Sequence, residues 1–287
     1  MLKNYFLVTK PWIVAANLVA AAGVFFLAAQ GRFAPELFLC VMAGLCCVVA
    51  SGCVLNNYID RDIDRRMART CGRVLATDSI SLQGSLAYAA VLGLAGAALL
   101  LAGTNGLTLA VALCGFAVYV GAYSLYLKRN SVHSTVLGSL AGAAPPLAAY
   151  CAVRNSFDLG ALIVLAMFSL WQVPHSYAIT IFRRDDYAAA GLPVMSVRAG
   201  IAATKRHIVW HVAAFVVAAQ MLTAFGYAGY AYLVAATGLG LCWLGMALSG
   251  FRARDDRRWA RRLYRFSILT IFALSLMMSV DFARGPF

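Results

Sequence analysis

Charge is scarce in this sequence. Only 12% of the 287 residues are charged, 62% are hydrophobic, and the mean hydropathy is +0.78. A chain with so few charges and so many aliphatic residues is neither a disordered protein nor an ordinary soluble domain. The composition therefore indicates an integral membrane protein.

The sequence also lacks cysteines at the spacing of a zinc site. Its eight cysteines include no Cys-x-x-Cys pair and no flanking histidine, which argues against a structural zinc site and against a disulfide framework. Seven of them lie within or at the ends of apolar stretches, where a free cysteine behaves as a small buried hydrophobe. Cys71 is the exception, because it lies in a charged loop and is a candidate reactive thiol.

The net charge of +13 does not indicate a nucleic-acid partner here. A soluble protein with this charge would be a candidate for binding nucleic acid. In a membrane protein, basic residues instead collect in the loops on the cytoplasmic side. We therefore expect a lipid bilayer, and no nucleic acid, as the partner.

Nine apolar runs are long enough to cross a bilayer. A helix of ~20 residues, rising 1.5 Å per residue, covers about 30 Å of hydrocarbon. The runs lie at residues 11–29, 36–58, 82–102, 106–126, 133–152, 159–182, 205–226, 229–250 and 263–282. The sequence therefore predicts an all-α integral membrane protein with nine transmembrane helices.

The loops between nine spans alternate between the two sides of the membrane. All basic residues except Arg32, Arg154 and Arg284 then fall on the side of the N-terminus. By the positive-inside rule, we expect this side to be cytoplasmic and the C-terminus to be periplasmic, in the inner membrane. Every aspartate except Asp158 and Asp281 shares the basic side. Because carboxylates contribute little to topology, this second asymmetry points to chemistry, and carboxylates suit a hard cation such as Mg²⁺.

The first acidic cluster lies in residues 56–70, at the end of the second span. If the helix continues, Asn56, Asp60 and Asp64 are spaced i, i+4 and i+8 and project from one face. Three oxygen ligands in a row make a cation site, and the cation would relieve the repulsion between the two carboxylates. The alternative is a solvated helix end with alternating charges.

The second acidic cluster contains Asp185 and Asp186, after the sixth span. It follows the first cluster by four spans, which predicts a single domain of residues 1–287 with two tandem four-helix blocks. These blocks cover roughly residues 10–130 and 132–250, and the ninth helix follows at 263–282. If the two clusters face each other across a cavity, they can hold a diphosphate through metal ions. Alone, the second cluster would be an ordinary charged loop.

Basic residues accompany both clusters and are candidates to neutralise a departing diphosphate. The same residues are also expected from topology alone. They are Arg66, Arg69, Lys128, Arg129, Arg183 and Arg184.

The chain has four histidines, all in or beside apolar spans. His175 follows Pro174 inside the sixth span, and His133 begins the fifth. Because histidine within a span is costly unless it has a partner, each is a candidate substrate contact or axial ligand, or else forms an interhelical hydrogen bond. His207 and His211 have the i, i+4 spacing of a metal pair, but no carboxylate lies near them in sequence.

The segment Gly138 to Pro146 in the fifth span is unusually rich in small residues. Such residues commonly allow two helices to approach closely. They also leave room for a bulky apolar substrate. Both interpretations remain open from the sequence.

Several of these segments together resemble the UbiA superfamily of intramembrane prenyltransferases. The resemblance spans roughly residues 5–210, and the last spans match only in general character. The Pro-His-x-Tyr and Gly-Ala-Ala-Pro-Pro segments are similar to the branch that prenylates haem. The matching segments are Thr9 to Pro11 with Asn17-Leu18, residues 56–70, Tyr123 to Arg129, Gly138 to Pro146, Trp171 to Tyr177, and Arg184 to Tyr187 with Ala190 to Pro193.

The resemblance implies a fold in which nine transmembrane helices surround a central cavity. It implies farnesyl transfer from farnesyl diphosphate to a vinyl group of haem b, with addition of water. Haem b would be a substrate rather than a cofactor, and assembly factors of haem-copper oxidases are candidate partners. Arg73-Val74-Leu75 and Ser196 depart from the family pattern, in which proline is common at Val74 and at Ser196.

The implied site residues fall into three groups. Mg²⁺ would be held by Asn56, Asp60, Asp64, Asp185 and Asp186, and Lys128 would act with the four aspartates as a catalytic residue. The diphosphate would be contacted by Arg66, Arg69, Arg129 and Arg183. The isoprenoid and the porphyrin would be contacted by Tyr123, Tyr126, Tyr177, His133 and His175.

Two other functions remain open at this stage. A prenyltransferase acting on an aromatic quinone precursor would use the same diphosphate site with a different acceptor. A cation-coupled transporter is the alternative from a different class. It is less favoured because transport sites lie near the middle of the membrane, whereas these acidic residues cluster at one face.

Overall fold

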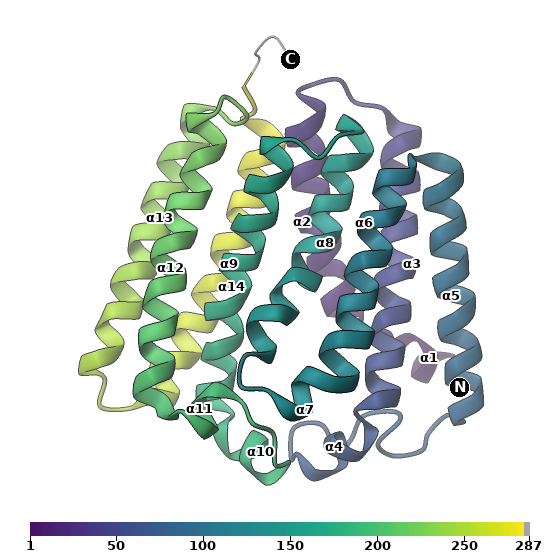
Figure 1. Ribbon diagram of the computed structural model, residues 1–287, viewed down its shortest axis with the longest axis vertical. Helices are drawn as coiled ribbons and strands as arrows, with labels where there is room; N and C mark the ends of the chain where they lie inside the picture. Colours follow the sequence, from purple (N-terminus) through teal and green to yellow (C-terminus); the bar gives the residue numbers. More distant parts are fainter. Residues whose placement is uncertain (284–287) are drawn as a thin grey trace.

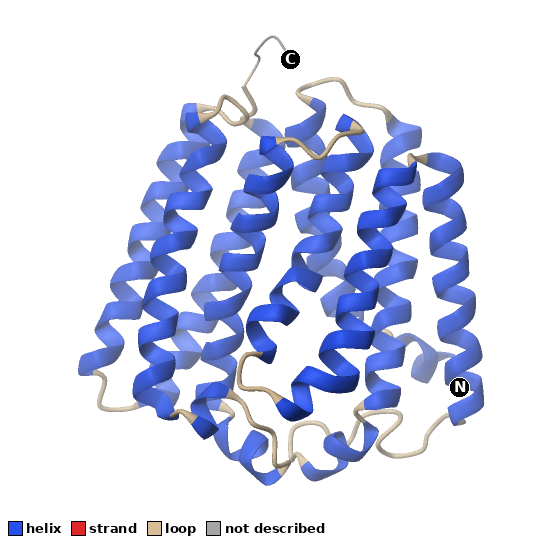
Figure 2. Ribbon diagram, viewed as in Figure 1, coloured by secondary structure: helices blue, strands red, loops and turns tan. Residues whose placement is uncertain are grey.

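The computed structural model describes residues 1–283, which form a bundle of long helices (Figures 1 and 2). Nine helices in this part of the chain are long and apolar enough to cross a membrane, as the sequence predicted. They are α2 (Pro11–Ala29), α3 (Pro35–Ile59), α5 (Leu82–Gly103), α6 (Gly106–Ala117) continued by η1 (Val118–Leu127) and α7 (Lys128–Asn130), α8 (Ser134–Arg154), α9 (Leu159–Phe182), α12 (Gly200–Ala224), α13 (Tyr230–Ser249) continued by η2 (Gly250–Arg252), and α14 (Asp256–Val280).

Two of these helices begin earlier than the apolar runs suggested. Helix α12 begins at Gly200 rather than near 205, and α14 begins at Asp256 rather than near 263. Lysine and arginine are good helix formers, so the basic residues there belong to the first turns although they are too polar to count as a span. The Asp255 carboxylate caps α14 by accepting a hydrogen bond of 3.0 Å from the backbone N–H of Arg258.

Four short helices gather at one end of the bundle, together with the N-terminus (Figure 1). They are α1 (Leu2–Val8), α4 (Arg61–Arg66), α10 (Arg184–Ala189) and α11 (Met195–Arg198). Helix α14 ends at the opposite end of the bundle (Figure 1). The two acidic segments of the sequence therefore lie at the same end, as the alternation of loops predicted.

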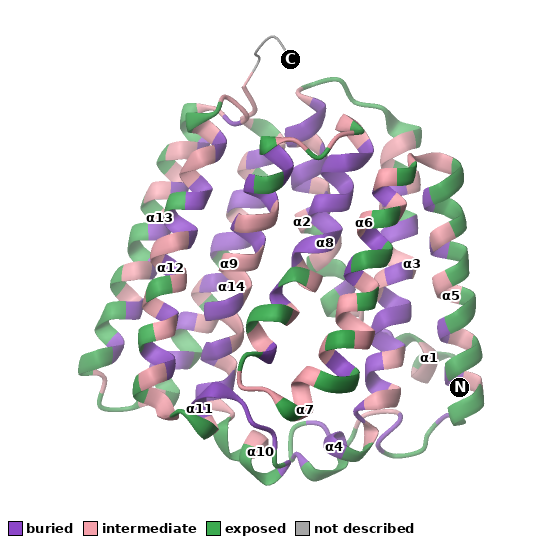
Figure 3. Cartoon of the chain, in the orientation of Figure 1, coloured by how far each residue is buried: buried purple, intermediate pink, exposed green. Residues whose placement is uncertain are grey.

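Buried residues concentrate on the helices at the centre of the bundle (Figure 3). The largest apolar cluster joins α2, α8, α9, α12, α13 and α14, and a second joins α2 to α3, α6 and α8. Helix α5 covers one side and leaves apolar residues such as Leu94 and Leu101 exposed. Large apolar side chains on the outer surface are expected for a protein whose solvent is lipid.

Helices α2 and α14 pack closely against each other at Gly23. A Cβ atom at this position would lie only 2.4 Å from the backbone oxygen of Ser275. Backbone atoms cannot rotate away as a side chain can, so glycine is required for this contact.

We expect Gly23→Ala to destabilise the protein by about 1–3 kcal/mol, because the added methyl group forces α2 and α14 apart. Gly238→Ala is the matched control, since a Cβ atom there meets nothing within 4 Å. The midpoint of thermal unfolding in detergent measures both. Equal midpoints for the two variants would contradict the close contact.

Candidate functional site

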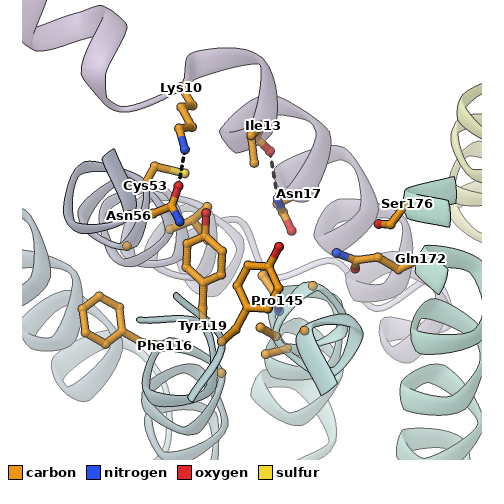
Figure 4. Close-up of a pocket in the computed structure, with 18 of the residues that line it drawn as sticks. Lys10, Ile13, Asn17, Cys53, Asn56, Phe116, Tyr119, Pro145, Gln172 and Ser176 are labelled. Atoms are coloured by element: carbon orange, nitrogen blue, oxygen red, sulfur yellow. Dashed lines mark hydrogen bonds between the residues drawn. The ribbon is translucent and has the colours of Figure 1, made fainter. Parts of the chain in front are cut away.

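A central cavity of about 310 Å³ opens among α2, α3, η1, α8 and α9. Its lining combines apolar side chains with four cations, namely Lys10, Arg69, Arg73 and Lys128. Figure 4 shows Lys10 and Asn56 on one side of the cavity and Gln172 and Ser176 entering from the other side. The site is therefore an apolar chamber with a strongly cationic part.

Asn56 is the centre of a buried hydrogen-bond network. Its amide nitrogen donates to a carboxylate oxygen of Asp60 at 2.8 Å and to the Ser124 hydroxyl at 2.9 Å. Its amide oxygen accepts a hydrogen bond from the Lys10 ammonium group. Asp60 is 0% exposed and forms an ion pair with Lys128 through Oδ2, while its Oδ1 has no partner among the described residues.

Asp64 lies one turn further along and also lines the cavity. Its two carboxylate oxygens accept hydrogen bonds of 2.9 and 2.8 Å from one guanidinium nitrogen of Arg73. The helix does not run through this region unbroken, because α3 ends at Ile59 and α4 begins at Arg61. Backbone hydrogen bonds from Asp60 to Asn56 and from Asp64 to Asp60 nevertheless keep the i, i+4, i+8 relation.

The fourth span contains a π-helix at residues 118–127, which the sequence analysis did not anticipate. In this segment Ser124 donates a hydrogen bond of 2.8 Å to the backbone oxygen of Tyr119, five residues earlier. The rings of Tyr119 and Tyr123 stack with centroids 6.1 Å apart, and both line the cavity. The π-helix therefore directs two tyrosines to the cavity and Ser124 to Asn56. Such segments are frequent at functional sites.

The small residues of α8 allow close packing, which is one of the two purposes considered from the sequence. A Cβ atom at Gly115 of α6 would lie 2.2 Å from the Cβ atom of Ala144, so the two helices pack closely there. At Gly138 and Gly142, the space is instead filled by side chains that line the cavity. The Tyr123 ring lies over Gly138, and the Gln172 amide lies over Gly142.

The second acidic segment reaches the cavity through Tyr187, whose pKa is raised by burial. Asp185 and Asp186 do not line the cavity. Asp185 is 78% exposed and forms an ion pair with Arg257, and Asp186 lies 3.7 Å from Arg183. Among residues 1–283, no three histidine, cysteine or acidic side chains lie close enough to hold one metal ion together.

The two acidic segments contact each other through apolar side chains. Ile63 and Met67 of the first segment pack in one cluster with Leu192 and Val194 of the second. Tyr187 packs against the same cluster. Met67 and Tyr187 of this contact also line the cavity.

The remaining residues singled out from the sequence divide between the cavity and other positions. Tyr123, Arg69 and Lys128 line the cavity, as does Asn56. Outside its lining lie Asp60, which is fully buried, and Arg66, Tyr126, Arg129, His133, His175, Tyr177, Arg183 and Arg184. Arg129 pairs with Asp62, and the hydrogen bond from Arg129 lowers the pKa of that carboxyl group to about 2.

His175 lies between α9 and α14. Its Nδ1 is 2.8 Å from the Ser267 hydroxyl, and its ring lies 4.8 Å from those of Trp171 and Tyr264. This arrangement matches the interhelical hydrogen bond that the sequence left open as one of two possibilities. Trp171 strengthens the same contact by donating to the backbone oxygen of Ser267 at 2.9 Å.

The lining residues that were not identified as site residues from the sequence include Lys10, Arg73, Tyr119 and Gln172. In the sequence analysis, Lys10 belonged to the Thr9 to Pro11 segment and was one of the basic residues on the N-terminal side of the membrane. It adopts a left-handed backbone conformation with φ of 54°. Its pKa is lowered to about 8, chiefly by burial and next by the charge of Arg73. Nothing in the sequence showed that Arg73, nine residues beyond Asp64, would pair with it.

Comparison with known proteins gives one family. The sequence matches the model of the UbiA prenyltransferase family over residues 16–274. It is 57% identical to a protoheme IX farnesyltransferase of Chromohalobacter salexigens over 98% of this chain and 96% of that protein. It is 55% identical to a protoheme IX farnesyltransferase of Serratia proteamaculans over 99% of this chain and 96% of that protein.

Solved structures show the same fold at low sequence identity. A digeranylgeranylglyceryl phosphate synthase has a TM-score of 0.79 and 16% identity, covering 97% of this chain and 98% of that chain. A UbiA homologue from Archaeoglobus fulgidus, bound to DMAPP and Mg²⁺, has a TM-score of 0.73 and 13% identity, covering 96% of this chain and 99% of that chain.

We expect Arg73→Met to destabilise the protein by about 3 kcal/mol, because it leaves the buried Asp64 carboxylate without its counter-charge. The double variant Asp64→Asn with Arg73→Met should recover much of this loss. Arg65→Met is the matched control, because Arg65 forms an ion pair with Asp78 on the surface. Loss of this pair should lower the free energy of unfolding by less than about 1 kcal/mol. Thermal unfolding of the wild type, Arg73→Met, Asp64→Asn and the double variant gives the coupling energy, and a double variant no more stable than Arg73→Met would contradict it.

Proposed function

Because this chain belongs to the UbiA prenyltransferase family, we propose that it transfers a farnesyl group from farnesyl diphosphate to a vinyl group of haem b. Water adds in the same reaction, and the products are haem O and diphosphate. Relatives named protoheme IX farnesyltransferase match almost the whole chain at 55–57% identity. The structural feature that supports the proposal most directly is the set of four cations that line an apolar chamber.

The cationic part of the cavity suits a diphosphate. Lys10, Arg69, Arg73 and Lys128 come from three separate segments of the chain and all line the same cavity. Cationic groups form charge-assisted hydrogen bonds to phosphate oxygens, and such bonds are about twice as strong as neutral ones. Lys128 and Arg73 are paired with Asp60 and Asp64, whereas Lys10 and Arg69 form no ion pair among the described residues, so the cavity keeps cationic charge that an anion would compensate. A prenyl diphosphate supplies both the anion and an apolar chain.

The residues around Asp60 fit a magnesium ion. Asn56, Asp60 and Asp64 offer carboxylate and amide oxygens, which are the ligands that magnesium prefers. Asp60 Oδ1 is buried and has no partner among the described residues, so one oxygen is available without breaking a hydrogen bond. When bound, the ion would neutralise charge on the diphosphate oxygens. Ligation by Asp185 or Asp186 would require their ion pairs with Arg257 and Arg183 to open.

Lys128, Arg69 and Arg73 are placed to stabilise the leaving group. As the bond between the farnesyl carbon and the diphosphate oxygen breaks, negative charge accumulates on that oxygen. Cationic donors that are already in position stabilise this charge without reorganisation. Lys10 also holds the Asn56 amide, so it fixes one wall of the site as well as adding charge.

Tyr119 and Tyr123 are placed to stabilise the farnesyl fragment. The departing diphosphate leaves an allylic cation, and the face of an aromatic ring attracts a cation. The two stacked rings line the cavity beside the cations. Bulk water would capture the allylic cation before the haem vinyl group attacks it, so the apolar lining around the two rings favours transfer over hydrolysis.

The chain is a multi-pass membrane protein, and we place it in the inner membrane with the site at the cytoplasmic face. The short helices and the N-terminus lie at one end of the bundle, where the basic residues of the sequence collect. By the positive-inside rule, this end faces the cytoplasm and the C-terminus faces the periplasm. A diphosphate made in the cytoplasm would then reach the site without crossing the membrane.

We expect Asp60→Asn and Asp64→Asn each to reduce turnover by at least about 10²-fold, because each removes a charged oxygen at the diphosphate site. Asp78→Asn is the matched control, since this carboxylate is 69% exposed and lies outside the cavity. Product formation from labelled farnesyl diphosphate is the measurement. Elution on gel filtration and thermal midpoints show whether each variant is folded. Full activity in a folded Asp60→Asn protein would exclude a role for this carboxylate.

The acceptor is tested by supplying two candidate acceptors in separate incubations. Membranes containing the protein are incubated with labelled farnesyl diphosphate and either haem b or an aromatic acid of the quinone-precursor type. We expect a labelled product only with haem b. The Asp60→Asn protein is the control for other transferases in the membranes. A labelled product from the aromatic acid alone would defeat the haem proposal and favour the quinone-precursor function.

A further inference from the structure

Two polar side chains of α9 enter the central cavity on the side opposite Lys10 and Asn56 (Figure 4). Gln172 and Ser176 are spaced i, i+4, so both lie on one face of the helix. In the part of the chain that the structure describes, neither side chain forms a hydrogen bond. Both side chains can donate and accept hydrogen bonds. Binding of the diphosphate by the cations and of the isoprenoid by the tyrosines leaves these two groups unused.

Gly142 of α8 provides the space in which the Gln172 amide lies. A Cβ atom at residue 142 would lie 1.7 Å from Gln172 Oε1 and 2.5 Å from its Nε2. Any other residue at this position would therefore push the amide away. The amide is held here by packing rather than by a hydrogen bond to another described residue. Its N–H groups and its oxygen are thus available to a bound molecule.

Two prolines leave backbone acceptors in the same wall of the cavity. Pro145 and Pro146 lie inside α8 and have no N–H. The carbonyl oxygens of Ala141 and Gly142 therefore lack the donor that an α-helix supplies four residues later. Both of these residues line the cavity. Backbone carbonyl groups away from bulk water are nearly always paired, and an ordered water molecule is one of the partners that can pair them.

These groups together match the requirements of one ordered water molecule. A buried water makes about three hydrogen bonds to polar groups of the protein. The Gln172 amide, the Ser176 hydroxyl and the carbonyl oxygens at the Pro145 kink supply both donors and acceptors. None of these groups is charged. The set therefore favours a neutral polar molecule over a phosphate or a metal ion.

The proposed reaction forms two carbocations in succession. The first is the allylic cation that remains when the diphosphate leaves with the electron pair of the broken C–O bond. The terminal vinyl carbon of haem b attacks this cation, a C–C bond forms, and the positive charge moves to the vinyl carbon next to the porphyrin ring. A lone pair of the water oxygen then forms a C–O bond to that carbon. The proton that the water loses passes to the diphosphate, so atoms and charge balance.

The position of the water decides which of the two cations it captures. Water beside Lys10 and Asn56 would lie next to the diphosphate and would hydrolyse the farnesyl fragment. The vinyl group attacks from the side away from the leaving diphosphate, so the second cation forms farther from the cationic part of the cavity. Gln172 and Ser176 enter from that far side (Figure 4). A water held there meets the second cation after the C–C bond has formed.

We propose that Gln172 and Ser176 bind the water molecule that adds to the farnesylated vinyl group, with Gly142 keeping the Gln172 amide in place. This inference rests on the proposed function, because water is a reactant of that reaction. Both side chains are neutral, so they orient the water and do not remove its proton. The Gln172 amide oxygen accepts a hydrogen bond from the water, which increases the electron density on the attacking oxygen.

Product analysis with the purified full-length protein in detergent tests the proposal. The protein is incubated with farnesyl diphosphate and haem b in water labelled with heavy oxygen, and the haem products are separated and identified by mass spectrometry. We expect the wild type to give a labelled alcohol with one configuration at the new stereocentre. Without a bound water, the second cation instead loses a proton from the neighbouring carbon and gives an alkene, whose mass is lower by one water.

We expect Gln172→Leu to raise the ratio of alkene to alcohol at least about tenfold, the effect of one lost hydrogen bond to the reacting water. Gly142→Ala should act in the same direction although Gln172 is present, because the added methyl group displaces the amide. Ser176→Ala removes a single oxygen atom and should also raise the ratio. Consumption of farnesyl diphosphate should change less than the ratio, because the cations govern departure of the diphosphate.

Gln83→Leu is the matched control, since Gln83 is exposed and does not line the cavity. Gel filtration and thermal midpoints show which variants are folded. Wild-type ratio and configuration in a folded Gln172→Leu protein would overturn the proposal, as would a raised ratio in Gln83→Leu. Wild-type products from a folded Gly142→Ala or Ser176→Ala protein would overturn the role assigned to that residue.

The same assay separates this failure from that of the proposed function. If the wild type makes the labelled alcohol and Gln172→Leu makes it unchanged, only the water site is overturned. If the wild type makes an alcohol without the label, its oxygen does not come from water, and the water site is again overturned while farnesyl transfer stands. If the wild type makes no farnesylated haem, both proposals are overturned.

Discussion

The ion pair between Asp60 and Lys128 is the interaction on which the site depends. Asp60 has no exposed surface, and an unpaired carboxylate in such a position would be strongly destabilising. Lys128 lies 68 residues away in the chain, at the end of the fourth span. The pair therefore fixes the end of α3 against the end of η1. Asn56 joins the same contact through Ser124, so the cavity wall between the two spans is held by polar bonds.

The π-helix positions residues for this contact. An α-helix and a π-helix place side chains at different angles around the axis, since the π-helix has i to i+5 hydrogen bonds. Residues 118–127 adopt the wider turn, and Ser124 then reaches Asn56 while Tyr119 and Tyr123 face the cavity. Gly138 of α8 leaves the space that the Tyr123 ring occupies. A wider helix on one side and a missing side chain on the other together create the chamber.

The sequence was sufficient for the fold and for part of the site. Apolar runs predict the nine helices because length and hydropathy decide whether a segment spans the membrane. Spacing predicted that Asn56, Asp60 and Asp64 would share a face. Asn56 and Asp64 line the cavity, whereas Asp60 is buried against Lys128 and does not line it. Spacing gives no information on contacts between distant helices, so the pairing of Arg73 with Asp64 was not foreseen. The π-helix left no sequence signal either, because its residues are as apolar as those of an α-helical span.

The acidic residues show why charge patterns alone do not locate a metal site. Both clusters were identified because carboxylates gather at one membrane face, but each carboxylate there has a cation beside it. Asp185 pairs with Arg257 of α14, and its exposure makes that pair a surface contact of little energetic value. Asp60 is buried instead, and one of its oxygens has no partner among the described residues. Burial with an unpaired oxygen, rather than sequence spacing, distinguishes the carboxylate that is available to a ligand.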